Sequence, residues 1–164
     1  TFFKDNNDYK LVIVGDPNAA KKGELADYQN EVKDFAEYLG AQCIFVGGVH
    51  PDKIRHYYSI ADIIATPSIA DEAFCMVALE AMASGRPVIA SQRGAMVEFI
   101  THNETGFIFR EPLSPQSMAE DIQSALNHPD RLKIATNARE YAYNNFTWEI
   151  VTAELQSVIQ KWYS

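Results

Sequence analysis

The chain has 164 residues, of which 47% are hydrophobic and 22% charged, so it is long enough for one globular domain with a hydrophobic core. Its formal net charge of −8 argues against sequence-independent binding to nucleic acids, which depends on neutralising phosphates. No apolar run reaches the length of a membrane span and no basic-then-apolar leader opens the chain, so a cytoplasmic location is expected. Cys43 and Cys75 form no Cys-x-x-Cys pair, which argues against a disulfide framework or a zinc site.

Short apolar runs alternate with amphipathic stretches along the chain, and turn residues separate them. Short apolar runs predict buried strands, whereas apolar residues spaced by three and four predict helices. The predicted strands are Lys10–Val14, Cys43–Val46, Ile63–Thr66, Pro87–Ser91 and Gly106–Phe109. The predicted helices are Glu24–Leu39, Pro51–Ile60, Phe74–Ser84, Pro115–Asn127, Asp130–Asn144 and Trp148–Trp162. Gly40 is expected to end the first helix, and Ser114 to cap the helix that follows it.

Apolar strands separated by helices predict an α/β domain with a parallel sheet and helices on both faces, which is a Rossmann-like fold. In such sheets, ligands bind outside the carboxyl ends of the strands. The segments that follow the predicted strands are Gly15-Asp16, Gly47–His50, Pro67–Phe74 and Ser91–Ala95. A binding site is therefore expected among these segments.

The segment after the third strand combines acidic residues with the start of a helix. Glu72 precedes the predicted helix and Glu80 lies on it, while backbone N–H groups near Phe74, Cys75 and Met76 are free at its beginning. Such N–H groups favour a phosphate, and carboxylates accept hydrogen bonds from sugar hydroxyls, so a nucleotide sugar fits this combination. Acidic residues at a helix start also stabilise the helix dipole without any ligand, and the local pattern leaves both interpretations open.

A longer run of residues carries a family resemblance. Glu72-Ala73-Phe74-Cys75, Leu79-Glu80-Ala81 and Gly85-Arg86-Pro87-Val88 resemble the signature of the retaining GT-B glycosyltransferases of "group 1", which include sucrose synthase and many bacterial polysaccharide enzymes. The family's Glu-x7-Glu pair falls on Glu72 and Glu80. Further similar positions are Phe45–Val49, Tyr58–Asp62, Gly94, Glu98, Thr105–Phe107 and Phe146–Glu149. The resemblance implies the C-terminal half of a GT-B fold and extends from Lys10 to the end of the chain.

The resemblance implies a role for each matched position in the binding of a nucleoside-diphosphate sugar. Glu72 contacts hydroxyls of the donor sugar and is the candidate catalytic residue, and Glu80 takes the ribose 2′- and 3′-hydroxyls. Backbone N–H groups at Phe74, Cys75 and Met76 hold the sugar and the diphosphate. The substrate is the nucleotide sugar itself, and the resemblance implies neither a cofactor nor a metal.

A second group of positions is less distinctive. The backbone at Gly48 and Val49 is implied to meet the edge of the base, although Gly47 and Gly48 also fit a tight turn. His50 fits an exposed loop histidine, and Gly94 fits either a close approach to the ligand or a turn. Met76, Val77, Leu79 and Met82 are expected in the core, so that Met76 contributes to the site only through its backbone.

The sequence departs from the family's usual pattern at two positions. Cys75 stands where the family usually has glycine, and its side chain is expected to reshape the phosphate contact or the choice of donor. No general base accompanies Cys75, so it is not interpreted as a nucleophile. Ala95 stands where a second glycine is common, with a mild expected effect.

The family's domain normally begins with a further strand, a Gly-Arg pair and a lysine that are implied to bind the donor diphosphate. The chain begins after them, and Lys21, Lys22, Arg86 and Arg93 are not in a matching context. Residues 1–164 are therefore predicted to form a donor-binding domain without the first strand and without the N-terminal acceptor domain, and to be inactive alone. The missing strand belongs between the first and third predicted strands. Thr1–Phe3 or another chain is expected to fill the gap, or the 164 residues are a piece of a longer chain.

The leading interpretation is a donor-binding domain for retaining transfer of a hexose to an acceptor in carbohydrate or polysaccharide biosynthesis. The alternative is a non-catalytic nucleotide-sugar-binding or interaction module, while phosphorylase- or epimerase-like chemistry is disfavoured by the Glu72–Glu80 motif. Self-association is expected through the sheet gap or the last helix, where Ile150, Leu155, Ile159 and Trp162 are apolar. Any peripheral membrane association is expected only through the N-terminal domain.

Overall fold

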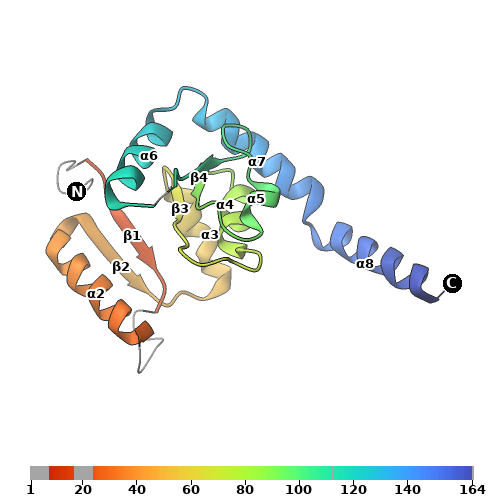
Figure 1. Ribbon diagram of the computed structural model, residues 1–164, viewed down its shortest axis with the longest axis horizontal. Helices are drawn as coiled ribbons and strands as arrows, with labels where there is room; N and C mark the ends of the chain where they lie inside the picture. The colour runs from red at the N-terminus through yellow and green to blue at the C-terminus, as the bar shows by residue number, and fades with distance from the viewer. Residues whose placement is uncertain (1–7, 17–23, 112, 164) are drawn as a thin grey trace. The chain divides into compact units, whose positions relative to one another are not determined.

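The structure is a computed structural model that describes residues 8–16, 24–111 and 113–163 (Figure 1). It divides into two compact units, Thr1–Ile54 and Arg55–Ser164, which are considered separately. The expectations for Thr1–Phe3, Lys21 and Lys22 lie outside the described residues.

The first unit is a small parallel α/β arrangement. Its elements are β1 (Leu11–Val14), α2 (Glu24–Leu39), a short 3₁₀ helix η1 (Gly40–Gln42) and β2 (Cys43–Gly47). β1 and β2 pair in parallel, with Leu11 opposite Cys43 and a register shift after Ile13. Gly40 has a φ of 57°, which confirms it as the residue that ends α2.

The strands of this unit are less buried than the sequence predicts. Val12 on β1 is 40% exposed and Ile44 on β2 is 48% exposed. α2 packs against β2, and no residue of either strand is fully buried. The expectation of fully buried strands is wrong here, because a strand is buried on both faces only when layers of helices cover both.

The second unit holds the remaining strands and most of the core. After α3 (Pro51–Ile60), which crosses the boundary between the units, it contains β3 (Ile64–Thr66), α4 (Met76–Ala83), β4 (Val88–Ala90), α5 (Met96–Phe99), β5 (Phe107–Ile108), α6 (Pro115–Asn127), α7 (Arg131–Asn145) and α8 (Trp148–Tyr163). The strands pair in parallel in the order β3-β4-β5. α5 and η1 are single turns with too few residues to show a helical period, so the sequence does not predict them.

The five described strands therefore form two sheets, β1-β2 and β3-β4-β5, and not one. Within the described residues, no strand pairs with the second edge of β1 or with the second edge of β3. The further strand that the family resemblance implies has no counterpart among these five strands. Unpaired strand edges leave backbone donors and acceptors without partners from a sheet.

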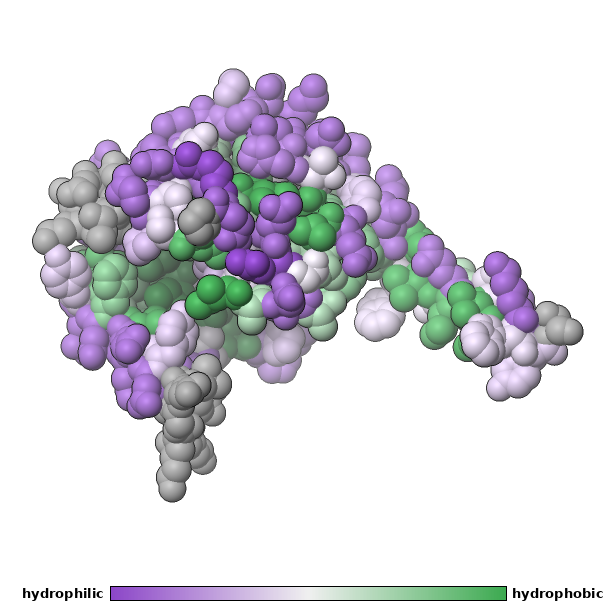
Figure 2. Space-filling model, viewed as in Figure 1, coloured by the Kyte–Doolittle hydropathy of each residue, from purple (hydrophilic) through white to green (hydrophobic). Residues whose placement is uncertain are grey.

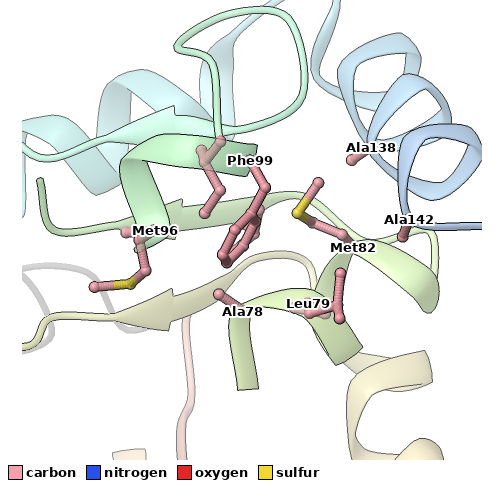
Figure 3. Packing of buried hydrophobic residues seen from close by; sticks show 11 residues of the cluster. Ala78, Leu79, Met82, Met96, Phe99, Ala138 and Ala142 are labelled. Carbon is pink, nitrogen blue, oxygen red and sulfur yellow. The ribbon is translucent and has the colours of Figure 1, made fainter. Parts of the chain in front are cut away.

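The core of the second unit forms between α4, the sheet, α5 and α7 (Figure 3). Met82 on α4 is fully buried, and it lies beside the alanines at 138 and 142 on α7. These small residues let the two helices approach closely. Burying one large apolar side chain such as Met82 contributes roughly 1.5–3 kcal/mol, so α4 is firmly held against its neighbours.

The helices after the sheet differ in how they are fixed. Ser114 caps α6 as predicted, since its Oγ accepts a hydrogen bond from the N–H of Ser117 at 3.0 Å and the two residues form a capping box. Residues 151–163 of α8, in contrast, are all exposed. Their apolar members include Leu155 and Trp162, and Figure 2 shows apolar side chains along this helix. None of the described helices is long and apolar enough to cross a membrane.

Gly106 provides a test of the packing in the second unit. A Cβ at this position would lie 2.9 Å from Cγ2 of Ile100 and 2.9 Å from Cγ1 of Val88, two buried side chains that have little room to move. We expect Gly106→Ala to lower the free energy of unfolding by about 1–3 kcal/mol, measured by denaturant titration. Gly48→Ala is the control, because its nearest neighbour would be 3.8 Å away, and an equal loss in both variants would contradict the prediction.

Candidate functional site

The predicted site lies where two loops leave the carboxyl ends of neighbouring parallel strands. The loop 67–75 follows β3 and the loop 91–95 follows β4. The N–H of Ser91 donates to the carbonyl oxygen of Thr66 at 3.1 Å, which extends the β3-β4 pairing to the start of both loops. Further along, the N–H of Gly94 donates to Oδ1 of Asp71 at 3.2 Å, and the N–H of Ala95 donates to the carbonyl oxygen of Glu72 at 3.2 Å.

Gly94 is in direct contact with the backbone that carries Glu72. A Cβ at Gly94 would lie 2.0 Å from the carbonyl oxygen of Glu72 and 2.6 Å from its amide nitrogen. Its φ of 52° is also one that residues with a side chain rarely adopt. Gly94 lies in a turn, which confirms that interpretation, whereas its approach to a ligand stays a prediction.

The ring of Phe74 anchors the end of the first loop in the core. It packs 5.3 Å from the ring of Phe99 and 5.6 Å, edge to face, from the ring of Phe146. The ring is partly buried against the core, and the backbone role that the resemblance implies for Phe74 stays a prediction.

Cys75 separates this loop from α4. Its φ of 63° and ψ of 71° lie in the left-handed region, which an α-helix cannot include. The helix therefore begins at Met76, two residues later than predicted, and its first amides belong to Met76, Val77 and Ala78. The N–H of Ala78 already donates to the carbonyl oxygen of Cys75 at 3.0 Å. Phe74 and Cys75 present their amides from the loop and not from the helix.

The thiol of Cys75 is kept in its neutral form. Burial raises its pKa, and the charge of Glu72 raises it further, while N–H groups of Ala78 and Val77 and the hydroxyl of Thr66 oppose the shift. Burial also raises the pKa of the Cys43 thiol. A raised thiol pKa leaves little thiolate at neutral pH, which agrees with the expectation that Cys75 is not a nucleophile.

The two glutamates of the motif each have one neutral hydrogen-bond donor. The hydroxyl of Ser68 donates to Oε1 of Glu72 at 2.9 Å, and the hydroxyl of Tyr58 donates to Oε2 of Glu80 at 2.7 Å. Glu72 is exposed and Glu80 is half-buried. Glu80 also lines an open hollow of about 210 Å³ between α4 and the end of α7, with Leu79 and Phe146 among its other walls. Neither carboxylate forms an ion pair with a described residue.

The nearby arginines are engaged elsewhere. Arg86 donates to the carbonyl oxygen of Ser59, and the guanidinium of Arg93 pairs with Oε1 of Glu111 at 3.1 Å. Nε of Arg93 is buried with no hydrogen-bond partner among the described residues. No cluster of three metal-ligating side chains occurs in the described part of the chain either. The second unit thus offers acceptors and amides at this site, but no described cation in contact with the two glutamates.

The remaining predicted residues divide between core and surface. Leu79 and Met82 are buried as expected, but Met76 and Val77 are 56% and 47% exposed, so their placement in the core was wrong. The buried residues of α4 begin only at Ala78, so the first two side chains of the helix remain outside the core. The spacing of apolar residues does not show where this burial begins.

The residues predicted to meet the base lie in the first unit. Gly47 ends β2 with a φ of 82°, which glycine adopts without strain. No turn follows at residues 48–50, so the expected tight turn at Gly47 and Gly48 is not present. Gly48 and Val49 follow it, and their contact with a base remains a prediction. His50 is exposed as expected, with Nδ1 3.3 Å from Oδ2 of Asp52.

Comparison with known protein families identifies the family of this chain. Residues 2–145 match the family described as "Glycosyl transferases group 1". The chain belongs to the group 1 glycosyl transferases. The predicted fold class, a Rossmann-like α/β domain of the GT-B type, is confirmed by solved GT-B structures that cover more than nine-tenths of the chain.

Individual relatives show which part of a group 1 glycosyl transferase the chain resembles. The lipopolysaccharide 1,2-N-acetylglucosaminetransferase of Salmonella typhimurium is 43% identical over 94% of this chain and 40% of its own length. Anabaena HepE, solved in complex with UDP-glucose, is 28% identical with a TM-score of 0.79, over 93% of this chain and 41% of that one. The C-terminal domain of the Francisella tularensis group 1 protein LpcC is 28% identical with a TM-score of 0.72, over 90% of this chain and 74% of that one. The chain spans about two fifths of the length of the curated relatives it matches.

Three contacts of this group 1 glycosyl transferase site were not predicted from the sequence. They are the Tyr58–Glu80 and Ser68–Glu72 hydrogen bonds and the contact between Gly94 and the Glu72 backbone. Ser68 lies four residues before Glu72, a separation that a local turn can bridge, so its contact had a weak sequence signal. Tyr58 and Gly94 lie 22 residues from their partners, and only the folded sheet brings them there.

Cys75 offers a test of backbone strain at the site. A non-glycine residue in the left-handed region costs of order 1–3 kcal/mol, and part of the relief on Cys75→Gly is offset by the greater freedom of glycine in the unfolded chain. We expect Cys75→Gly to be about 0.5–1 kcal/mol more stable than Cys75→Ala, measured by denaturant unfolding. Cys75→Ala is the matched control because it removes the thiol and keeps Cβ. An alanine variant as stable as the glycine variant would contradict the strain at this position.

Gly94 offers a test of the contact between the two loops. Gly94→Ala places a methyl group against the Glu72 backbone, so the loop has to shift, and we expect a loss of about 1–3 kcal/mol in unfolding free energy. Gln92→Ala is the control, because Gln92 is exposed in the same loop. Thermal and denaturant unfolding of both variants measure the effect. An alanine at position 94 that left stability unchanged would show that the two loops are not held together as described.

Proposed function

We propose that this chain is the donor-binding domain of a retaining, hexose-transferring enzyme, and that it binds a nucleoside-diphosphate sugar at the start of α4. The observation that carries the proposal is the pair of carboxylates on either side of this helix start. Glu72 precedes it and Glu80 follows it by one turn, each with acceptor oxygens that no described cation neutralises. Carboxylates left without cations are suited to hydroxyl groups, of which a nucleotide sugar has several.

The physical roles within the proposed complex follow from the groups present. The amides at the start of α4 and the positive end of its dipole favour the diphosphate. Glu80 accepts hydrogen bonds from the ribose hydroxyls. Glu72 accepts them from the donor sugar, next to the bond that breaks, and it is our candidate catalytic residue.

Transfer breaks the bond between the anomeric carbon and the diphosphate oxygen and forms a bond from that carbon to the acceptor oxygen, with the configuration retained. The acceptor hydroxyl gives up its proton, which the departing diphosphate or water takes. The departing diphosphate then carries additional negative charge, which an enzyme stabilises with oriented donors and cations. Arg86 and Arg93 already have partners in the described structure. We therefore propose that the complete enzyme supplies these cations and the acceptor site from outside residues 1–164, and that this chain alone does not transfer sugar.

The relatives suggest which donor to test first. Anabaena HepE was solved with UDP-glucose, and the Salmonella relative is an N-acetylglucosaminetransferase. We propose a uridine nucleotide as the donor, with its base meeting the backbone at Gly48 and Val49. We also propose that the enzyme acts in the cytoplasm without a cofactor, with the exposed face of α8 or the free strand edges as the places of self-association.

Binding of donors to the complete gene product tests the proposal. We expect calorimetric titration to show binding of at least one of UDP-glucose, UDP-N-acetylglucosamine, GDP-mannose and ADP-glucose, with a uridine compound binding best. Glu80→Gln removes the charge that strengthens hydrogen bonds from the ribose, so we expect a loss of about tenfold or more in affinity. The measurement is the dissociation constant for the best donor.

Glu140→Gln is the matched control, because Glu140 is exposed on α7 and its substitution removes the same charge elsewhere. Equal losses in the two variants would indicate a general effect of charge and would contradict the role of Glu80. No binding of any nucleotide sugar by the folded protein would overturn the proposed function and would favour an interaction module.

A further inference from the structure

The hydroxyl of Tyr58 forms a side-chain contact that the proposed donor roles do not include. Tyr58 lies near the end of α3, and its Oη donates to Oε2 of Glu80 at 2.7 Å, across 22 residues of sequence. Both side chains are half-buried. A short hydrogen bond from a neutral donor to a carboxylate in such a place is stronger than one between neutral groups in water.

The chemistry of Tyr58 keeps it a donor. Burial raises the pKa of its phenol well above the ordinary value, and the hydrogen bond to Glu80 and the charge of Glu80 raise it further. The phenol therefore stays protonated through the neutral range, where it can only donate to the carboxylate.

We propose that Tyr58 is a positioning residue that holds Glu80 ready for the vicinal hydroxyls of the donor ribose. This inference rests on the proposed function of Glu80. A glutamate side chain that is free in solution loses rotational freedom when a ligand binds, which weakens binding. Glu80 has already lost much of that freedom to Tyr58, so less is lost when the ribose arrives.

The acceptor capacity of Glu80 is sufficient for both partners. Each carboxylate oxygen can accept about two hydrogen bonds, and Tyr58 uses one position on Oε2. Oε1 has no partner among the described residues. Two vicinal hydroxyls can then donate one hydrogen bond to Oε1 and one to the remaining position on Oε2, so Tyr58 orients the carboxylate without competing for the ligand.

A purely structural role is the other interpretation, in which Tyr58 only ties α3 to α4. The neighbouring residue argues against this being its main role, because Arg86 already donates to the carbonyl oxygen of Ser59 and anchors the same end of α3. A structural tie also predicts an effect on stability alone. A positioning role predicts an effect on ribose recognition, and the two can be separated by experiment.

The experiment compares Tyr58→Phe with Tyr57→Phe in the complete gene product. Tyr57 is half-buried on the same helix, and no hydrogen bond of its hydroxyl occurs in the described part of the chain. Dissociation constants are measured by calorimetry for UDP, GDP and ADP, each beside its 2′,3′-dideoxy form, which lacks both vicinal hydroxyls. We expect Tyr58→Phe to weaken binding of the ribose form of the preferred nucleotide about three- to tenfold, with less than about a twofold change for the 2′,3′-dideoxy form. Tyr57→Phe is expected to change neither.

Additional measurements distinguish a failure of the proposed function from a failure of the positioning role alone. In a Glu80→Gln background, Tyr58→Phe is expected to have little further effect on ribose binding, because the two residues act through one carboxylate. Melting temperatures show that each variant is folded. If the unsubstituted protein binds none of the diphosphates, the proposed function and this inference fail together. If it prefers ribose forms and Tyr58→Phe weakens both sugar forms equally or neither, the positioning role alone is overturned.

Discussion

The packing of α4 between the sheet and α7 is the constraint on which the site depends. Half of this eight-residue helix is buried, with Met82 and its buried neighbours against β4, α5 and α7. A helix held on so much of its surface cannot rotate. Its first turn and Glu80 are therefore placed by the core, and the site acquires its geometry from apolar contacts that no ligand touches.

The backbone around the start of α4 is correspondingly tight. Two residues with positive φ, Cys75 and Gly94, lie on the two loops that leave β3 and β4. Gly94 is needed because its missing Cβ leaves room for the Glu72 backbone, whereas Cys75 adopts a conformation that glycine would adopt without strain. Strain of this kind is held only where the surrounding structure over-determines it, and the aromatic packing of Phe74 supplies that support.

The free strand edges and the exposed α8 are both surfaces of a kind that other protein normally covers. The second edges of β1 and β3 pair with no described strand, and residues 151–163 on α8 are exposed along with their apolar side chains. Exposed apolar surface and unpaired edges are normally covered by other protein. The chain matches about two fifths of the length of its curated relatives, so the relatives contain residues without a counterpart in this chain. These surfaces are where we expect such residues, or a second copy, to pack.

The features that the sequence alone determined depend on residues close in the chain or on motifs with fixed spacing. The order of strands and helices, the capping of α6 by Ser114 and the glycine that ends α2 depend on residues close in the chain, and each is confirmed. The family followed from motif residues at set spacings around Glu72 and Glu80, and it is confirmed too. The assignment of ligand groups to these glutamates stays a prediction, because no ligand contact is part of the comparison.

What only the tertiary structure decided depends on contacts between distant segments. Met76 and Val77 are exposed although their apolar side chains predicted the core, because burial depends on what the fold packs against each part of α4. The burial of a strand depends on which layers cover it. The apolar sequences of β1 and β2 predict buried strands, but side chains on both strands are exposed. The hydrogen bond from Tyr58 to Glu80 joins two helices, and no sequence pattern relates these two residues. Only the packing of α3 and α4 within the folded unit brings the Tyr58 hydroxyl within 2.7 Å of Oε2 of Glu80.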